Sequence, residues 1–408
     1  MSVEPLQMPD PTASSQLAAP IRDGHEIHQA ALRHGLNVVL YPRQVLMVTT
    51  PDGEHELSFI HGIPQSSTLA AVTYAQDKRM RRAHLERAGV PVPRGATFSV
   101  GRGLNDAKNF AERIGYPIVV KPAMGDNAIE TFHNVLDEDQ FDRAIDYLRT
   151  PPTERDTFVR SAYALTELRE PGEEEGRVVV PPGYRFLIEE QVKGEYIRIL
   201  VVGGEARSAV LLPVPPSSME SSEAGQDVFD ELHATARQLA ADAIRAVPGL
   251  TVGFVDLVVT DHRHPVADQH AWVVELGERP GLSAQASVSG ELSQAGGASI
   301  LRHHAGERSI DLPDPQDDVA VEFHAAAVPD LDGAVTVIAE IARSMELSGY
   351  IEITDRVEGI ADGVLQGPAQ HIAWLAEMLV DGTLAGHSAM LVEERHRERQ
   401  ELDTFTVR

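Results

Sequence analysis

Two acidic residues interrupt otherwise apolar segments between residues 253 and 281. Asp256 lies within GFVDLVV, Glu275 lies within WVVELG, and Arg279 follows shortly after. A carboxylate inside such a run is costly unless a positive charge compensates it. Two strands joined by the polar turn DHRHPVADQH would bring both acids to one face. Carboxylates for a hard cation, with an arginine for phosphate oxygens, indicate a magnesium–nucleotide site. Salt-bridged acids at strand ends are the alternative.

Further upstream, two lysines and one acid stand where they could bind a nucleotide. Lys121 ends the apolar segment YPIVVK, so a strand would deliver its ammonium to a following loop, where it suits phosphate oxygens. A surface lysine at the end of a strand is also common, so Lys121 alone is a weak signal. Lys78, in AQDK, is equally weak alone. The segment FLIEEQVKG reads as an apolar strand that turns polar. Its backbone and Glu189 could bind an adenine edge, although a solvated edge strand would look the same.

Composition limits the class of protein. The net charge of −27 argues against nucleic-acid or anionic-membrane partners. The absence of cysteine excludes disulfides, thiolate metal sites and cysteine nucleophiles. No apolar run reaches membrane-spanning length, and the N-terminus lacks signal-peptide features, so we expect a cytoplasmic protein. The histidines show no metal-ligand spacing, and we assign them no role.

The elements that must position these residues alternate between helix and strand. Strands are expected near 37–41, 45–49, 56–60 and 117–121, and a single helical stretch is expected over 67–89. After a linker at 313–318, strands and helices follow in the order βαββαβ, which is that of a ferredoxin-like domain. The fold class is therefore α/β (α+β).

The order of motifs DK, AGVPVP, YPIVVKP, LIEEQVKG, VDLVV and VVELGERPG is similar to that of the ATP-grasp carboxylate–amine ligases. The resemblance is closest to the ligase parts of cyanophycin synthetase and bifunctional glutathione synthetase, and it covers residues 25–305. It implies an ATP-grasp fold, with ATP and Mg²⁺ as cofactors. The expected division is a disordered N-terminus (1–20), an N-terminal α/β domain (21–90), a lid and central domain (91–200), a catalytic domain (201–315), a C-terminal domain (316–396) and a frayed tail (397–408).

The same resemblance implies a role for each matching residue. Arg279, Arg198 and Lys121 would act in catalysis, close to the transferred phosphate. The nucleotide would be held by Lys78, Lys121, Glu189, Val192 and Gly125 (in the phosphate loop), and the metal by Asp256 and Glu275. The family's ribose-binding acid falls at Tyr196, so Glu195, one position earlier, is expected to bind the ribose instead.

Two departures from the family pattern matter for function. The third metal ligand of the family is an asparagine, but Gly277 stands at that position. The C-terminal unit resembles acylphosphatase, yet its phosphate loop carries Asp330 and Asp332 in place of an arginine, and these acids would repel phosphate. We therefore expect that unit to have a structural or dimer-forming role, and a gate over the ligase site is the alternative.

These observations favour an ATP-dependent ligase that joins the carboxylate of an amino acid or short peptide to an amine through an acyl phosphate. We expect amino-acid or peptide substrates, a homodimer, and neither nucleic-acid nor membrane partners. The alternative is a nucleotide-binding protein with a degenerate site and no turnover.

Overall fold

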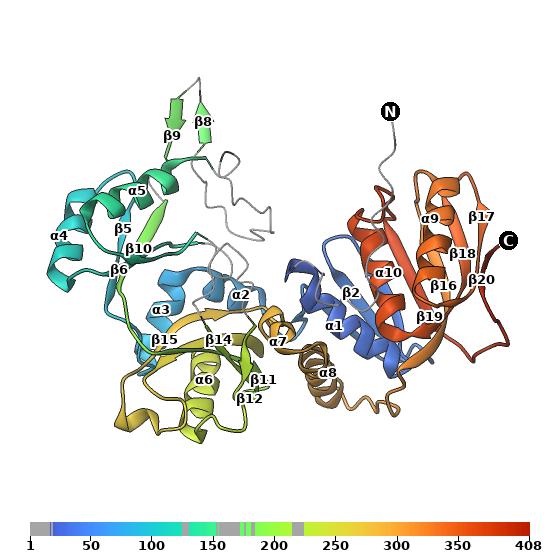
Figure 1. Cartoon of the computed structure of the whole chain (residues 1–408), viewed down its shortest axis with the longest axis horizontal. Coiled ribbons are helices and arrows are strands. Elements are labelled where there is room, and N and C mark those ends of the chain that lie inside the picture. The colour runs from blue at the N-terminus through green and yellow to red at the C-terminus, as the bar shows by residue number, and fades with distance from the viewer. Residues whose placement is uncertain are drawn as a thin grey trace. The chain divides into compact units, whose positions relative to one another are not determined.

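Apolar runs in the sequence build the strands, and these join into three main sheets of a mixed α/β fold (Figure 1). The computed structural model describes residues 17, 19–124, 130–151, 154, 172–174, 177–180, 184–213 and 224–408. The chain divides into two units, one made of Met1–Gln65 and Ser289–Arg408, the other of Ser66–Val288. No described helix is long and apolar enough to cross a membrane.

The second unit contains a four-stranded antiparallel sheet that carries Lys121. Its core face packs against helices α4 and α5 through Phe186, Ile188 and Val120. Successive residues of a strand point to opposite faces, so the neighbours of these residues along each strand point away from the helices. Lys121, Val119 and Glu189 lie on that opposite face. The strands, in sheet order, are β5 (Gly95–Ser99), β10 (Arg185–Glu190), β6 (Ile118–Pro122) and β7 (Phe132–Val135), and the helices are α4 (Leu104–Ile114) and α5 (Glu138–Arg149).

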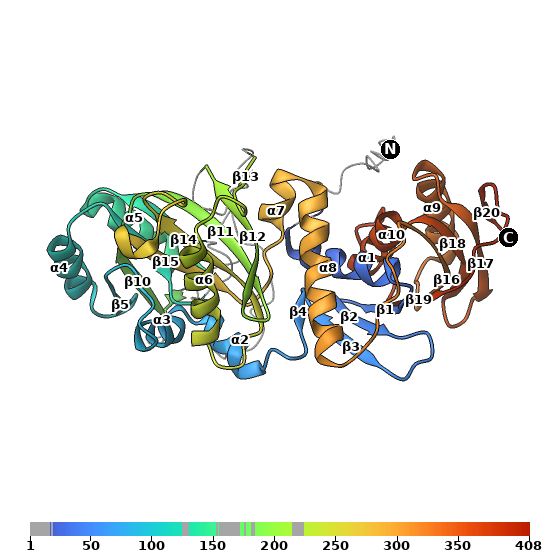
Figure 2. The ribbon, with the colours of Figure 1, turned by 90° about the horizontal axis from the view of Figure 1, so that it is seen from below.

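A five-stranded sheet in the same unit carries the two acids. Helix α6 (Ala234–Ala246) packs on one face, as Figure 2 shows. Asp256 lies on β14, which is buried along its whole length, and Glu275 lies in the buried second half of β15. Its strands, in sheet order, are β13 (Gln226–Asp227), β12 (Glu205–Leu212), β11 (Glu195–Val202), β14 (Val252–Val259) and β15 (Ala271–Gly277). This unit also contains a hairpin of β8 (Gly172–Glu174) and β9 (Arg177–Val179), the short helix η3 (Val266–Asp268) and α7 (Ser283–Val288).

The helical stretch expected over 67–89 is two helices, α2 (Leu69–Gln76) and α3 (Lys78–Arg87). Asp77 separates them because its extended backbone ends α2 while its side chain caps α3 by accepting from the backbone N of Arg79. The break places Lys78 at the first turn of α3, where its backbone N donates to the carbonyl of Ala123.

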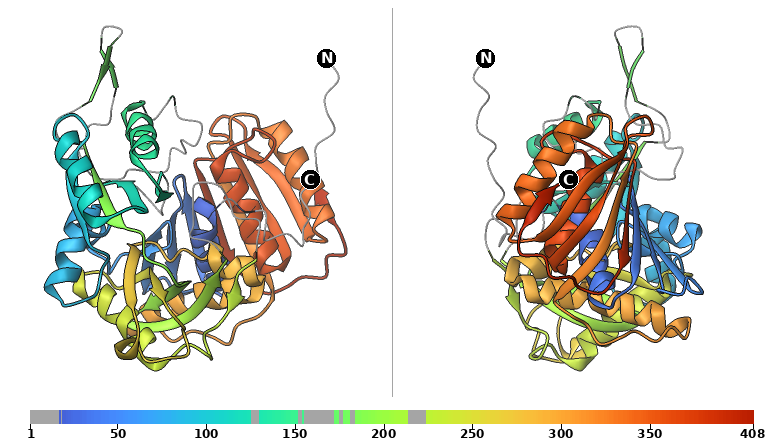
Figure 3. Two further views of the ribbon diagram at one scale, coloured as in Figure 1. Left: turned by 60° about the vertical axis from the view of Figure 1, so that its left-hand side comes forward. Right: turned by 90° about the vertical axis from the view of Figure 1, so that its right-hand side faces the viewer.

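The first unit is built on one nine-stranded sheet. Figure 3 shows helices α9 and α10 on one face of its C-terminal strands, which follow the expected order βαββαβ from β16 to β19. In sheet order the strands are β20 (Phe405–Val407), β17 (Ser348–Asp355), β18 (Ile360–Pro368), β16 (Asp318–Ala326), β19 (Leu391–His396), β1 (Asn37–Tyr41), β2 (Val45–Thr49), β3 (Glu56–Ile60) and β4 (Ile63–Pro64). The helices are α1 (Ala19–Arg33), α8 (Gly290–Glu307), α9 (Leu331–Ser344) and α10 (Ala369–Asp381).

This sheet differs from the expected domain division. Strand β1 pairs with β19, so residues 37–64 and the C-terminal strands share one sheet instead of forming domains over 21–90 and 316–396. The expected frayed tail also contains a strand, because Phe405 is buried and β20 pairs in parallel with β17. The resemblance of the C-terminal strands to acylphosphatase stays a prediction.

Candidate active site

A cavity of about 500 Å³ opens within the second unit, and residues from both of its sheets line it. The segment between β10 and β11, which includes Val192, forms one wall together with Glu195 at the start of β11. The four-stranded sheet contributes Lys121 and Glu189, and the five-stranded sheet contributes Glu275. Five of the expected site residues therefore line one cavity of the size typical for small-molecule ligands.

Lys121 is buried and makes its closest contact with an acid on the neighbouring strand. Its Nζ lies 2.7 Å from Oε2 of Glu189 and 3.1 Å from the carbonyl O of Val274. The other oxygen of Glu189 accepts from Nη1 of Arg82 at 3.0 Å. Both oxygens of Glu189 are thus bound to cations, and its expected contact with adenine would need one of these pairs to open.

Glu275 is surrounded by positive charge. Its Oε1 lies 2.5 Å from Nη2 of Arg81, and its Oε2 lies 3.7 Å from Nζ of Lys121. Burial alone would raise the pKa of Glu275, but Arg81, Lys121 and then Lys78 outweigh it and hold that pKa at about 2. Glu275 is therefore ionised throughout the physiological range.

Lys78 lines a smaller cavity that shares Lys121, Glu189 and Glu275 with the larger one. Arg81 and Arg82 complete its charged lining. Four cations and two carboxylates leave an excess of two positive charges (4 − 2), although the whole chain carries −27. Such a local excess suits an anion.

Asp256 is fully buried and held by two side chains of β11. Nε of Arg198 donates to its Oδ1 and Nη2 to its Oδ2, both at 2.7 Å, and the hydroxyl of Tyr196 donates to Oδ2 at 2.8 Å. Arg198 and Asp256 are direct cross-strand partners, as are Asp256 and Glu275, so the three lie side by side on adjacent strands. Burial and Asp256 together raise the pKa of Tyr196.

Gly277 and its neighbours leave no obvious replacement for the third metal ligand. A Cβ at Gly277 would lie 2.2 Å from the ring of Phe254. Glu278 is buried, and its Oε1 accepts from Nε2 of Gln76 at 2.9 Å. Arg279 is buried just after β15 and does not line the large cavity.

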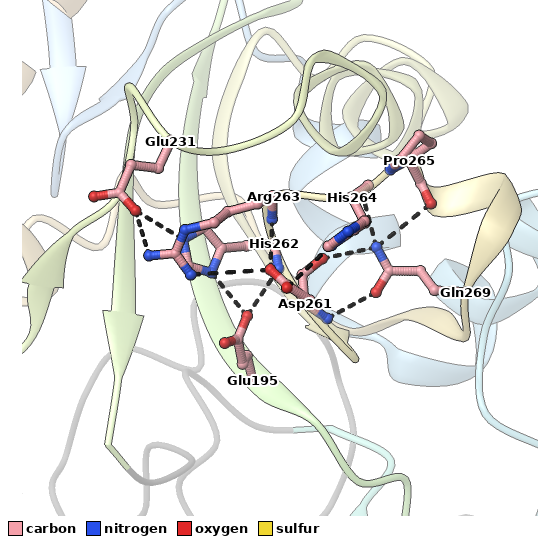
Figure 4. Close-up of polar contacts among 8 residues, drawn as sticks. All are labelled: Glu195, Glu231, Asp261, His262, Arg263, His264, Pro265 and Gln269. Carbon is pink, nitrogen blue, oxygen red and sulfur yellow. Dashed lines mark hydrogen bonds and ion pairs between the residues drawn. The ribbon is translucent and has the colours of Figure 1, made fainter.

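Glu195 lies at the start of β11 and contacts the loop that follows β14 (Figure 4). Its Oε2 accepts from the backbone N and from Nδ1 of His262, each at 2.8 Å. The expected ribose contact would therefore compete with His262. The phosphate-loop contact assigned to Gly125 falls on residues 125–129, which lie outside the described part of the chain.

Sequence reasoning missed three residues of this site, namely Arg81, Arg82 and His133. The arginines belong to the run KRMRR, which reads as a solvated helical face, but α3 turns both toward the acids. His133 lines the large cavity from β7, and burial followed by the charge of Lys121 lowers its pKa to about 4, so it is neutral at pH 7. In the sequence, only a break at Asp77 could have indicated where α3 begins, and therefore which of its side chains face the acids.

The donor set fits a nucleotide better than it fits a metal ion. The cavity volume and the cations beside it suit a nucleotide with a polyphosphate chain. For Mg²⁺ the carboxylates are Glu275 and Asp256, but both oxygens of Asp256 are bound to Arg198 and Tyr196. A metal at Asp256 would need these bonds to rearrange, so the metal assignment stays a prediction.

Parts of the chain are similar to known ATP-binding and ligase proteins. The model of the carbamoyl-phosphate synthase L chain ATP-binding domain matches residues 77–128. A cyanophycin synthetase from Synechocystis sp. is 29% identical over 123 residues, which are 30% of this chain and 14% of that protein. A D-alanine–D-alanine ligase from Gloeobacter violaceus is 23% identical over 259 residues, 61% of this chain and 74% of that protein. Among solved structures, a D-alanine–D-alanine ligase from Bacillus anthracis complexed with ATP is 18% identical, covers 60% of this chain and 69% of that one, and has a TM-score of 0.40.

Proposed function

We propose that the chain is a ligase of the ATP-grasp type that joins a carboxylate to an amine at the expense of ATP, because residues 77–128 match an ATP-binding domain and two ligases are among its relatives. The carboxylate of an amino acid or short peptide would attack the γ-phosphorus of ATP, releasing ADP and forming an acyl phosphate. The amine would then displace phosphate and form the amide. Amino-acid substrates are proposed because the curated relatives are named as a cyanophycin synthetase and a D-alanine–D-alanine ligase.

One observation carries the proposal, the excess of positive charge where the two cavities meet. Lys78, Lys121 and Arg81 gather around Glu275. A cluster of buried cations is unfavourable by itself, and a polyphosphate would compensate it. In the bound state the lysines would form charge-assisted hydrogen bonds with phosphate oxygens.

The roles of the remaining residues follow from their positions. Val192 and the adjoining backbone would bind the adenine, because this segment between β10 and β11 forms one wall of the larger cavity. Magnesium, held by Glu275, would neutralise charge on the transferred phosphoryl group. Arg198, fixed in orientation by Asp256, would stabilise the carboxylate or the acyl phosphate.

The test is a screen of ADP release over all pairs of proteinogenic amino acids, followed by hydroxylamine trapping with each active acid. An acyl phosphate gives a hydroxamate together with ADP, whereas an adenylate mechanism gives AMP and pyrophosphate. Lys121→Met should suppress trapping because the phosphate loses a positive partner. Lys108→Met removes a lysine of α4 that pairs with Glu138 and Asp142 of α5, and it should leave the trapping unchanged. Production of AMP would contradict the mechanism.

A second candidate is a nucleotide-binding protein without turnover. The observation that favours it is the occupation of Asp256 by Arg198 and Tyr196, together with the lack of a side chain at Gly277. The two candidates differ in one measurement. If ATP raises the unfolding temperature of the chain but no acid supports ADP release or trapping, the second candidate is correct.

A further inference from the structure

The start of β11 and the loop that follows β14 together form a cluster of side chains that could bind a metal ion. Glu195, Asp261 and His262 each offer one ligand atom, and these atoms lie within 4.8 Å of one another (Figure 4). His262 is only 1% exposed, whereas Glu195 and Asp261 are partly exposed. An ion could therefore reach the cluster from solvent and find a fixed imidazole there.

The hydrogen bonds of His262 leave one ring nitrogen unsatisfied. Nδ1 lies 2.8 Å from Oε2 of Glu195, and a carboxylate can only accept, so Nδ1 carries the proton. Nε2 is buried and has no hydrogen-bond partner, and Oε2 of Glu231 lies 3.7 Å from it. A buried ring nitrogen without a hydrogen-bond partner is unfavourable.

A metal ion at Nδ1 removes this conflict. With Nδ1 bound to the ion, the ring proton moves to Nε2 and points toward Glu231. This is the arrangement in which a ligating histidine donates its second N–H to a carboxylate. Bonds of about 2.0–2.2 Å hold two ligands of a tetrahedral zinc ion about 3.3–3.6 Å apart. The 2.8 Å between Nδ1 and Oε2 of Glu195 would therefore widen by about 0.5–0.8 Å when the ion replaces the hydrogen bond.

We propose that Glu195, Asp261 and His262 form a binding site for a divalent transition-metal ion of the zinc type, separate from any ion bound with the nucleotide. One imidazole and two carboxylates suit zinc or manganese, and water would complete the coordination. Because Glu195 also lines the large cavity, the ion would draw its carboxylate into coordination and link the start of β11 to the loop after β14.

Neighbouring charges are compatible with this site. The backbone N of Arg263 donates to Oδ1 of Asp261. The other oxygen, Oδ2, lies 3.0 Å from Nδ1 of His264 and is the one that would bind the ion. The guanidinium of Arg263 bonds to Glu231 and approaches Oδ1 of Asp261 only to 4.0 Å. Arg263 therefore balances Glu231, while the negative charge of Glu195 and Asp261 is left for the ion.

The test measures zinc binding to the full chain by calorimetry, without nucleotide or magnesium, and compares three variants. His262→Asn keeps a donor near Nδ1 but removes the imidazole, and it should weaken binding by at least about tenfold. His270→Asn is the matched control, since His270 is exposed in the same loop and stacks on Trp272. His303→Asn tests the second cluster, formed by His303, His304 and Glu307.

Nitrogen NMR of the histidines provides an independent readout. In the wild type, zinc should shift one imidazole from the Nδ1–H to the Nε2–H form, and this signal should be absent in His262→Asn. Absence of stoichiometric binding would overturn the proposal, and so would binding that survives His262→Asn and is lost in His303→Asn. Neither result depends on ligase activity, so the proposed function is tested separately.

Discussion

Phe254 and Gly277 are direct cross-strand partners, and the ring of Phe254 fills the space that a side chain at position 277 would need. The same ring lies 4.0 Å from the guanidinium carbon of Arg198, which in turn binds Asp256. The glycine is therefore part of a packed arrangement of Phe254, Arg198 and Asp256. The ring of Phe254 therefore gives a structural reason for a glycine at position 277, where the resemblance implies an asparagine.

Gly277→Asn, which restores the family's metal ligand, should destabilise the protein. The new Cβ would lie 2.2 Å from the buried ring of Phe254, and overpacking of this kind costs about 1–3 kcal/mol or more. The measurement is urea-induced unfolding. In a double-mutant cycle, Gly277→Asn should cost less in a Phe254→Ala background than in the wild type, because the smaller side chain opens space for the asparagine. If Gly277→Asn alone is as stable as the wild type, the packing argument is wrong.

Glu275→Gln should lower both stability and turnover. Glu275 compensates the buried charges of Arg81 and Lys121, and breaking a buried pair costs about 3–5 kcal/mol. The measurements are the free energy of unfolding and ADP release at saturating magnesium. Glu205→Gln on β12 is the matched control, because it removes an acid paired with Arg207 at the surface. Equal effects of the two substitutions would argue against a charge-compensating role for Glu275.

The sequence predicted the parts of the site that lie on strands. Lys121, Glu189 and Glu275 are polar residues in apolar runs, and a strand fixes which face each occupies. The arginines of α3 could not be placed in this way, since a charged helix reads as solvated until its packing is known. The hydrogen bonds of Asp256 were also unpredictable, because they depend on the register between β11 and β14.

The nine-stranded sheet shows a similar limit for the fold. Each strand of the first unit is visible as an apolar run, but the pairing of Val39 on β1 with Glu393 on β19 joins residues more than 350 positions apart. Local sequence patterns contain no information about the pairing of strands that are so far apart in the chain. The position of Phe405 in β20 was missed for a related reason, since a strand of three residues surrounded by charge resembles a frayed tail.

Arg198→Lys should impair catalysis more than Tyr196→Phe does. Arg198 binds Asp256 through two parallel hydrogen bonds and stacks on Phe254, and a lysine can reproduce neither feature. Tyr196→Phe removes one hydrogen bond, at about 1 kcal/mol, and leaves the pair intact. The readout is the yield of hydroxamate at saturating ATP. A larger loss in Tyr196→Phe would show that the paired arginine is not the functional group.

The pH dependence of stability should reveal a buried imidazolium in the first unit. His28 is fully buried, with Nδ1 3.1 Å from Glu377 and Nε2 2.5 Å from Glu394, so both nitrogens face carboxylates. Burial opposes its protonation, but Glu394 and Glu377 outweigh burial and raise the pKa of His28 to about 10. The stabilisation is thus complete below pH 6.5 and is lost as pH rises through 10.

Between pH 7.5 and 9.5 the folded state should hold one proton that the unfolded state has lost, so unfolding free energy should fall by about 1.4 kcal/mol per pH unit. In a Trp272→Phe background the only tryptophan is Trp374 on α10, whose fluorescence reports on the first unit. The control changes His28, Glu377 and Glu394 all to Gln, because replacing His28 alone would leave two buried acids that titrate in the same window. This triple variant should show no such slope. An equally flat profile in the protein that retains His28 would mean that the imidazole is not protonated in the folded state.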